Sequence, residues 1–433
     1  MECHIQTWFN ERWQDSAVIT CPDVSRGGVK ANTFFEYTLD YAFAADGQAV
    51  SLNFPLDANL HQLSYWPAFL YDLIPQGAGR NYLLGQLGLA DGPGADFALI
   101  CAGAFNPIGR LRIGEAVDYY QHHIGRHDPA RAAGGLLLEQ FIARDDAFAE
   151  RMLVHGMLAA GTTGVQGAAP KYLLTRDRRG LWHADGALLD ADAADHCIVK
   201  LPRGKAEVDK KILRNEAAYM RVAQSMGLFV HGPLAHHNDM LFIPRFDRTV
   251  QQGRVLRHHQ ESAAAIAGIV GFDARPSQFV LLRALRRVLT DKAAGTLEFL
   301  LRDVLNLAMR NTDNHARNTA VQVISGEVRL TPLYDFAPMY LDPEAIARAA
   351  RWYHPHTGIE LNNWHDVIVA LELVPDEEHF LRENMVAFGF RLAGLADCMR
   401  DNGVDDDITS HLNAGIAEQC RQLRELKGHC AYG

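Results

Sequence analysis

The sequence predicts an α+β protein with a mixed α/β N-terminal half and a mostly helical C-terminal half. Up to about residue 250, short segments rich in β-branched and aromatic residues alternate with Gly-rich and charged turns, a pattern typical of strands. Beyond that point, apolar residues recur at spacings of three and four, the periodicity of helices packed on a core. The length of 433 residues is typical of two or three domains, and the sequence contains no internal repeat.

Length and composition favour a soluble, cytoplasmic protein. The 433 residues are 48% hydrophobic and 22% charged, and no apolar run is long enough to span a membrane. The N-terminus also lacks the basic and apolar segments of a signal peptide. The net charge of −10 argues against direct nucleic-acid binding, although a local basic patch is compatible with it. The seven cysteines form no CxxC pair, so neither a disulfide framework nor a zinc site is expected.

The individual elements follow from the local patterns. Strands are expected at 16–21, 33–39, 172–175, directly after the turn at 176–180, at 196–202 and at 240–248. Helices are expected within 67–88, at 208–227 with Gly227 as its terminal residue, and at 279–289, 295–311, 365–373, 377–399 and the charged C-terminal end.

Three regions are expected along the chain. Residues 1–135 form an N-terminal α/β subdomain. Residues 136–248 hold a Gly-rich loop, a strand that ends in a lysine and a helix that carries a glutamate. Residues 249–433 form a helical C-terminal region that contains a polar loop followed by a hairpin.

The polar loop "NTDNHARN" follows directly on an apolar helix and precedes two strands joined by the turn dipeptide Ser325-Gly326. A two-residue turn pairs Ile324 with Glu327, and the same register places Asn318 opposite Leu333. Asp335, two residues further along its strand, then points to the same face as Asn318. Both side chains are therefore expected to reach one divalent cation. The alternative interpretation of the loop is a solvated turn, since Asn and Asp favour turns.

Asp313 stands five residues before Asn318, and this spacing is typical of phosphotransferases of the protein-kinase type. Mg²⁺ prefers hard oxygen ligands, which Asn318 and Asp335 supply. Asp313 would then accept the proton of the attacking hydroxyl. ATP and Mg²⁺ are the expected cofactors.

A kinase-type site also needs a cation on the phosphates and a carboxylate that holds it. Lys200 ends a strand, and Glu216 lies sixteen residues later on the apolar face of a helix, where an isolated charge is costly. Lys200 is the expected partner of Glu216. The alternative is a glutamate whose head group reaches water at the edge of the helix.

The remaining parts of an ATP site are a phosphate loop and an adenine-binding strand. The stretch "GTTGVQGAAPK" lies upstream of Lys200, where backbone N–H groups would cradle phosphates, and "MLFIPRF" follows the long helix as the hinge strand would. The expected ATP-binding residues are Thr163, Gly164, Val165, Gln166, Gly167, Lys171, Lys200, Glu216, Ile243, Pro244 and Phe246.

With these parts in kinase order, the sequence resembles the HipA-type Ser/Thr kinases, the toxin component of bacterial type II toxin–antitoxin systems. The resemblance rests on the stretches "NTDNHARN", "LTPLYDF", "IPRFDR", "CIVKLP" and "NEAAYMRVAQSMGL". It extends more loosely to the first 120 residues, for example to "LYDLIPQGAGR". The resemblance implies a kinase-like, two-lobe fold, with 136–248 as the small-lobe-like segment and 249–433 as the C-terminal lobe.

The resemblance also implies residue roles and partners. Asp313 would be the catalytic base, Asn318 and Asp335 would bind Mg²⁺, Lys200 would contact the ATP phosphates, and His315 would lie beside these phosphates. The substrate would be a protein Ser or Thr, such as that of an aminoacyl-tRNA synthetase, and a small helix-turn-helix antitoxin would be the partner. Thr162 and Thr163 stand where the family carries an autophosphorylated serine, the loop before Lys171 is longer, and Pro244 replaces an acidic residue.

Two other functions remain open at this point. A small-molecule phosphotransferase shares the Asp-plus-five-Asn arrangement, but such enzymes usually carry a His two residues before the Asp, where this chain has Asn311. An inactive kinase-like co-repressor that binds a DNA-binding antitoxin would need no chemistry. The competent residue types at all catalytic positions argue against it.

Overall fold

The structure is a computed structural model of the chain, and it describes residues 1–44, 47–125, 134–144 and 169–429. The chain divides into two compact units. Unit 1 comprises Met1–Arg203 and Ala235–Ala274, and unit 2 comprises Gly204–Leu234 and Arg275–Gly433. Helix α9 (Glu207–Ser225) thus groups with the C-terminal region rather than with the strands that flank it in sequence. The division at residues 135 and 248 stays a prediction.

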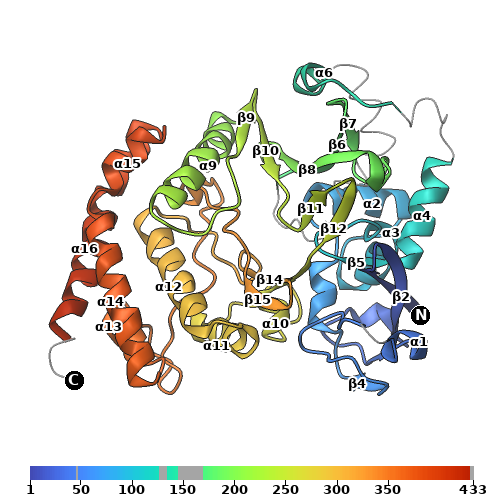
Figure 1. Cartoon of the computed structure of the whole chain (residues 1–433), viewed down its shortest axis with the longest axis horizontal. Helices are drawn as coiled ribbons and strands as arrows, with labels where there is room; N and C mark the ends of the chain where they lie inside the picture. The colour runs from blue at the N-terminus through green and yellow to red at the C-terminus, as the bar shows by residue number, and fades with distance from the viewer. Residues whose placement is uncertain (45–46, 126–133, 145–168, 430–433) are drawn as a thin grey trace. The chain divides into compact units, whose positions relative to one another are not determined.

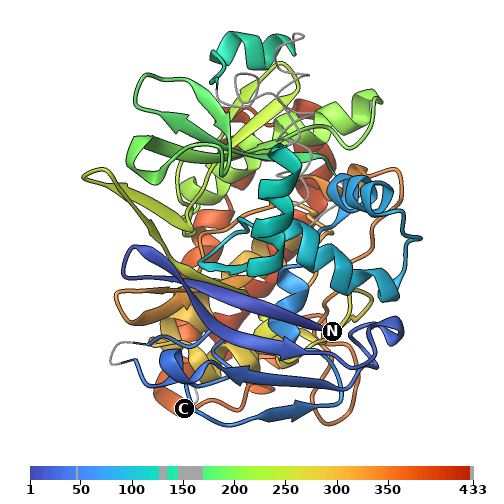
Figure 2. The same cartoon turned by 90° about the vertical axis from the view of Figure 1, so that its right-hand side faces the viewer.

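The first sheet of unit 1 is antiparallel throughout, in the order β4-β3-β2-β1-β5. Figure 2 shows β1 to β4 side by side, in shades of blue. Alternate residues of β1, such as Cys3 and Ile5, are buried and pack with Phe35 and Trp66. The strands are β1 (Glu2–Phe9), β2 (Arg12–Thr20), β3 (Thr33–Tyr37), β4 (His61–Leu63) and β5 (Leu111–Ile113).

Short helices accompany this sheet. The segment expected to form two helices within 67–88 contains a 3₁₀ turn at Ala68–Asp72 and then helix α2. The α-helices of this part are α1 (Leu39–Ala42), α2 (Gly77–Leu87), α3 (Asp96–Gly103) and α4 (Gly114–Ile124). Helix α6 (Leu138–Ala143) instead packs with residues of the second sheet, since its Phe141 clusters with Leu174 and Cys197.

The second sheet of unit 1 has the order β7-β6-β8-β10-β9. The strands expected at 172–175, after the 176–180 turn, at 196–202 and at 240–248 are confirmed, although the last one ends at Pro244. Its strands are β6 (Lys171–Asp177), β7 (Trp182–Ala184), β8 (Ala193–Lys200), β9 (Ala235–His237) and β10 (Met240–Pro244). Further along the chain come β11 (Arg248–Gln251), β12 (Arg254–Arg257), β13 (His259–Ser262) and α10 (Ala263–Ile266).

Unit 2 is mostly helical, as predicted. Figure 1 shows α14 and α16 running side by side, and α12 also packs on both of them. The prediction of a single helix at 377–399 is wrong, because this segment breaks at Ala393-Gly394 into two helices, α14 and α15. The remaining elements are α11 (Gln278–Val288), α12 (Lys292–Ala308), β14 (Ala320–Ile324), β15 (Glu327–Leu330), α13 (Trp364–Val369), α14 (Pro375–Leu392), α15 (Leu395–Asp401) and α16 (Asp406–Glu425).

The predicted α+β class is confirmed by this distribution of strands and helices. None of the helices in the described part of the chain has the length and apolar character that crossing a bilayer requires.

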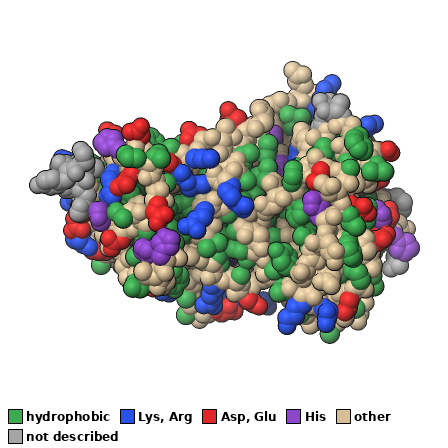
Figure 3. All heavy atoms as spheres, turned by 90° about the horizontal axis from the view of Figure 1, so that it is seen from below, with side chains coloured by type: hydrophobic (Ala, Val, Ile, Leu, Met, Phe, Trp, Pro, Cys, Tyr) green, Lys and Arg blue, Asp and Glu red, His purple; other side chains and the backbone are tan. Residues whose placement is uncertain are grey.

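On the face shown in Figure 3, Lys and Arg side chains gather in one place in the left half of the view, while acidic side chains are spread more widely. A local basic group therefore exists despite the net charge of −10.

A network of buried charges lies in unit 1 around Asp185. Its carboxylate accepts hydrogen bonds from Arg245 Nη1 at 2.7 Å and Arg248 Nη1 at 2.9 Å, and from the Thr175 hydroxyl at 2.8 Å. The side chains of Arg245 and Arg248 are at most 1% exposed, and that of Asp185 is 2% exposed. Burial of this kind is tolerated only because each charge is paired and hydrogen-bonded.

The network connects the chain directly after β10 to a loop more than a hundred residues earlier in the sequence. Arg248 Nη2 donates to Asn106 Oδ1 at 2.6 Å, and Asp247 Oδ2 accepts from the Gly109 N–H at 2.8 Å. Arg245 Nη2 donates to the carbonyl of Pro107 at 3.1 Å. The loop at 106–109 is thereby fixed to the chain directly after β10.

The network should make folding sensitive to acid. Burial raises the pKa of Asp247, but the charge and hydrogen bonds of Arg245 outweigh burial and lower this pKa to about 2. A carboxylate with a depressed folded pKa stabilises the fold above its unfolded pKa and stops doing so as the pH falls through the folded value. Between pH 5 and pH 2, urea denaturation should show that the wild type loses about 2 kcal/mol more stability than Asp247→Asn. Equal losses in both proteins would contradict this assignment.

Candidate active site

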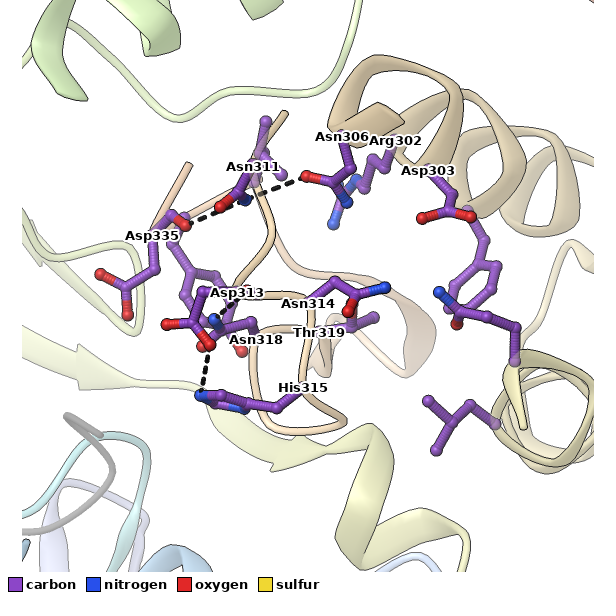
Figure 4. A pocket seen from close by; sticks show the side chains of 15 residues that line it. Arg302, Asp303, Asn306, Asn311, Asp313, Asn314, His315, Asn318, Thr319 and Asp335 are labelled. Atoms are coloured by element: carbon purple, nitrogen blue, oxygen red, sulfur yellow. Dashed lines mark hydrogen bonds and ion pairs between the residues drawn. The ribbon is translucent and has the colours of Figure 1, made fainter. Parts of the chain in front are cut away.

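A small pocket of unit 2 gathers the polar loop and the end of the hairpin. Asp313, His315, Asn318 and Asp335 all line it, together with side chains from α11 and α12. Figure 4 shows these side chains around one space, with His315 pointing toward Asp313. We call it the Asp313 pocket. It brings together the two predicted catalytic residues and the two predicted Mg²⁺ ligands.

The end of α12 positions the loop. The helix stops at Ala308, earlier than expected, and Arg310 adopts a left-handed φ of 49° that turns the chain away. The buried Tyr219 of α9 caps this end, because its hydroxyl donates to the Met309 carbonyl at 3.1 Å. Further along, the Asn318 N–H donates to the His315 carbonyl at 2.9 Å, which closes a tight turn.

Asp313 and His315, the two residues predicted to be catalytic, lie next to each other, and their catalytic roles stay a prediction. His315 Nε2 lies 3.7 Å from Asp313 Oδ1, and the two side chains are 31% and 27% exposed. His315 Nδ1 accepts from the Arg317 N–H at 3.2 Å, so Nε2 is the nitrogen turned toward Asp313. A half-exposed carboxylate of this kind can receive a proton from a hydroxyl that enters the pocket.

The side chain of Asn318 is oriented by the backbone of Asp313. Its Nδ2 donates to the Asp313 carbonyl at 2.8 Å. This hydrogen bond within the loop occupies the amide nitrogen. The amide oxygen, which is an acceptor, is therefore the atom that can face a ligand. This is the orientation that coordination of a cation by Asn318 requires.

Asp335 lines the pocket as predicted, but the strand pairing that was expected to place it there does not extend that far. The register is confirmed, since Ile324 pairs with Glu327, but the predicted pairing of Asn318 with Leu333 is wrong. The last ladder bond joins the Thr331 N–H to the Ala320 carbonyl, and the Leu333 N–H donates to Phe229 instead. The next N–H that would face β14 is that of Leu333, and the ladder ends after Thr331 because this N–H bonds Phe229.

Beyond the hairpin, the backbone of Asp335 has a left-handed φ of 50°. Non-glycine residues adopt this conformation at a cost and do so often at functional sites. The turn brings Asp335 to the pocket wall, where its carbonyl oxygen accepts from Asn311 Nδ2 at 3.5 Å. The side chain itself is half-buried.

Three pocket residues escaped the sequence analysis. Asn306, on α12, accepts from Asn311 Nδ2 at 3.0 Å (Figure 4). Asn314 Oδ1 accepts from the Ala349 N–H at 3.0 Å, and Asp303 accepts from the Trp352 indole at 2.8 Å. Their role follows from tertiary packing, and the only sequence signal was the density of Asn in and before the loop.

The donor set of the pocket fits Mg²⁺. One carboxylate and one amide oxygen are few ligands, but Mg²⁺ commonly takes one or two protein oxygens and keeps its other positions for water and phosphate. Within the described ranges, no group of three or more His, Cys, Asp or Glu side chains is arranged to hold a metal. A fully protein-built metal centre is therefore not what these residues form.

The expected ATP-binding residues of the sheet lie in unit 1. In β6 and β8, Lys171 pairs directly with Lys200 across the strands, so their side chains point to the same face. Two ammonium groups placed opposite each other repel unless anions lie nearby. Ile243 and Pro244 end the neighbouring strand β10, and Phe246 follows it.

The remaining residues predicted to contact ATP are Glu216 and those of the Gly-rich loop. Glu216, on α9 of unit 2, is 1% exposed, which confirms that it lies on the buried face of its helix. Its pairing with Lys200 of unit 1 stays a prediction. The Gly-rich loop residues lie outside the described residues, namely Thr162, Thr163, Gly164, Val165, Gln166 and Gly167.

Comparison with known protein families supports the family resemblance that the sequence stretches indicated. Residues 163–391 match the HipA-like C-terminal domain, and residues 24–114 match the HipA N-terminal domain. No curated protein matches the sequence.

Among solved structures, HipA of the Shewanella oneidensis MR-1 toxin–antitoxin system, in complex with HipB and operator DNA, has a TM-score of 0.65. It is 18% identical, and the match covers 98% of this chain and 99% of that chain. This likeness shows a shared fold and confirms the kinase-like fold class. The kinase CtkA of Helicobacter pylori, at 12% identity over 54% of this chain and 88% of that chain, has a TM-score of 0.37, too low to establish a common fold. Since the C-terminal domain match spans more than half of the sequence, the chain belongs to the HipA family.

Proposed function

We propose that this protein is an ATP- and Mg²⁺-dependent Ser/Thr protein kinase of HipA type. The observation that supports it most is the Asp313 pocket, where a half-exposed carboxylate, an amide oxygen oriented by a backbone hydrogen bond and a second carboxylate line one space. Bound Mg²⁺ would supply positive charge to the transferring phosphoryl group. The protein supplies the proton acceptor, the ligands and their orientation.

In this proposal Asp313 orients the hydroxyl of the substrate and takes its proton. His315 lies beside this carboxylate and restricts its position. Asn318 and Asp335 hold the metal against the phosphates, and Lys200 and Lys171 bind the phosphates of ATP. Glu216 would hold Lys200 in place, and the backbone of Ile243 and Pro244 with the ring of Phe246 would hold adenine.

The proposed physiological role is that of the toxin of a toxin–antitoxin pair, acting on a protein of translation such as an aminoacyl-tRNA synthetase. The partner would be a small helix-turn-helix antitoxin. The solved HipA is bound to HipB and operator DNA, which supports this partner class. Incubation of a cell lysate with labelled ATP, followed by identification of labelled proteins, tests the substrate. Transfer to a small molecule alone would favour the small-molecule phosphotransferase, and no transfer at all would favour the co-repressor.

Replacing Asp335 with Asn should uncouple ATP binding from Mg²⁺. Asn tolerates the left-handed backbone but lacks the negative charge that attracts the metal. Calorimetry should show that Mg²⁺ raises the ATP affinity of the wild type at least about tenfold and has little effect on the variant, a difference of about 1.4 kcal/mol. Asp401→Asn, at an exposed position of α15, should behave like the wild type. Equal ATP binding by the wild type with and without Mg²⁺ would refute the metal assignment.

The Gly-rich loop is proposed to be a regulatory phosphorylation site at Thr162 or Thr163. A phosphate there would add about −1.5 to −2 charges beside the phosphates of ATP and should weaken nucleotide binding. Intact-mass analysis of the wild type should show a phosphorylated species that is absent from Asp313→Ala and from the double variant Thr162→Val/Thr163→Val. If the double variant keeps the added mass, the phosphate is elsewhere.

A further inference from the structure

A second cavity of unit 2, of about 280 Å³, lies between α13, α16 and the chain at 348–363. About half of its wall is apolar, and Trp352, Trp364, Leu361 and Val367 contribute to this half. Both indole N–H groups are engaged elsewhere: Trp352 donates to Asp303 at 2.8 Å, and Trp364 donates to Gln419 at 2.8 Å. The rings are thus held in place and offer only carbon surface. We call this space the Trp364 cavity.

An ion pair with one charge of each sign also lines the cavity. Arg351 Nη1 lies 3.3 Å from both carboxylate oxygens of Glu360, and the two side chains are 41% and 36% exposed. An ion pair this exposed contributes little to stability, so a ligand can replace it at small cost. The backbone holds the two residues opposite each other, because Tyr353 bridges to Glu360 and the Leu361 N–H donates to the Trp352 carbonyl at 2.7 Å.

We propose that the Trp364 cavity binds a free α-amino acid with an apolar side chain. Arg351 would bind the carboxylate and Glu360 the ammonium group, while the side chain would lie against the apolar half of the wall. The volume lies just below the roughly 300–1,000 Å³ of sites for drug-sized ligands, which suits a molecule of this size. A nucleotide fits less well, because its phosphate would meet Glu360 as well as Arg351. An internal peptide segment carries neither terminal charge.

Hydrogen bonds connect the cavity to the Asp313 pocket. Asp303 lines that pocket and accepts from Trp352 and, at 2.8 and 3.0 Å, from Arg348 Nη2. The neighbouring residues Ala349 and Ala350 donate their N–H groups to Asn314 in the polar loop. A ligand against Trp352 would therefore act on the loop that carries Asp313, and this consequence rests on the proposed kinase function.

Calorimetry with L-leucine, L-phenylalanine and L-tryptophan tests binding without any need for kinase activity. At least one of the three should bind saturably to the full chain. Removing one charge, as in 3-phenylpropionate, should weaken binding at least about tenfold relative to L-phenylalanine, and so should removing both, as in N-acetyl-phenylalanine amide. No saturable binding at millimolar concentration, or equal binding of the uncharged compound, would overturn the proposal.

Two conservative variants locate the site. Arg351→Gln and Glu360→Gln should each weaken amino-acid binding at least about tenfold without lowering the melting temperature, because both side chains are partly exposed. Arg283→Gln, an exposed position of α11 outside the cavity, is the matched control and should bind normally. Unchanged binding in both cavity variants would place the amino acid elsewhere and refute the assignment. An amino acid that binds but leaves phosphate transfer unchanged would refute only the coupling to Asp313.

Discussion

Replacing Asp313 with Ala should lower phosphate transfer by about 10²–10⁴-fold, the usual contribution of a positioned general base. ATP binding should persist, because the proposed contacts to the nucleotide and the metal come from other residues. The melting temperature should change little, since the Asp313 side chain is 27% exposed and its loss opens no core cavity. The measurement is transfer of labelled phosphate at matched ATP occupancy.

The matched control is Asp401→Ala, which removes an exposed carboxylate of unit 2 far along the sequence from the loop. It should transfer phosphate at the wild-type rate. If the protein is a growth-inhibiting toxin, cells should tolerate Asp313→Ala at expression levels at which the wild type and Asp401→Ala stop growth. Undiminished transfer by Asp313→Ala would mean that the polar loop is only a turn.

The largest effect on stability is expected for Asp185→Ala. Burial raises the pKa of Asp185, yet the positive charges of Arg248 and Arg245 outweigh burial and hold this pKa well below its ordinary value. The variant leaves both arginines buried without this carboxylate, and breaking a buried pair from one side costs about 3–5 kcal/mol. Chemical denaturation should therefore show a free energy of unfolding that is lower by this amount.

Asp195→Ala is the control on the same sheet. Asp195 pairs with Arg176, but their side chains are 53% and 45% exposed, so the loss of this pair should change stability by less than about 1 kcal/mol. A second comparison separates charge from packing: adding Arg245→Met, Arg248→Met and Asp247→Asn to Asp185→Leu should recover part of the loss, because no unpaired charge remains buried once Asp247, the other carboxylate of the network, is also neutral. Similar costs for Asp185→Ala and Asp195→Ala would contradict the account.

The sequence predicted those parts of the fold that local rules decide. The register of β14 and β15 followed from the dipeptide Ser325-Gly326, whose residues adopt φ values of 52° and 84°, as a two-residue hairpin turn requires. The end of α9 likewise followed from Gly227, with a φ of 88°. The β11–β12 hairpin was missed, because its Gln252-Gly253 turn is a weaker signal than Asn-Gly or Asp-Gly.

What the sequence could not supply depends on contacts between distant segments. Arg245, Asp247 and Arg248 stood out as charged residues after a strand, but their burial depends on Asp185 and on the loop at 106–109. In the Asp313 pocket, Asp313, Asn318 and Asp335 were predicted from spacing. Asp303 and Asn306 were not, because only the packing of α12 brings them to the same space.

The end of the ladder after Thr331 has a consequence for how the hairpin can vary. Since Leu333 bonds Phe229 and not β14, Asp335 takes its position from this bond and from its own left-handed backbone. Inserting residues at the Ser325-Gly326 tip, or deleting a pair of strand residues there, should therefore leave the proposed metal ligand where it is. The tip is free to accept a tag or a fluorophore, whereas a single residue inserted between Pro332 and Asp335 would displace the carboxylate.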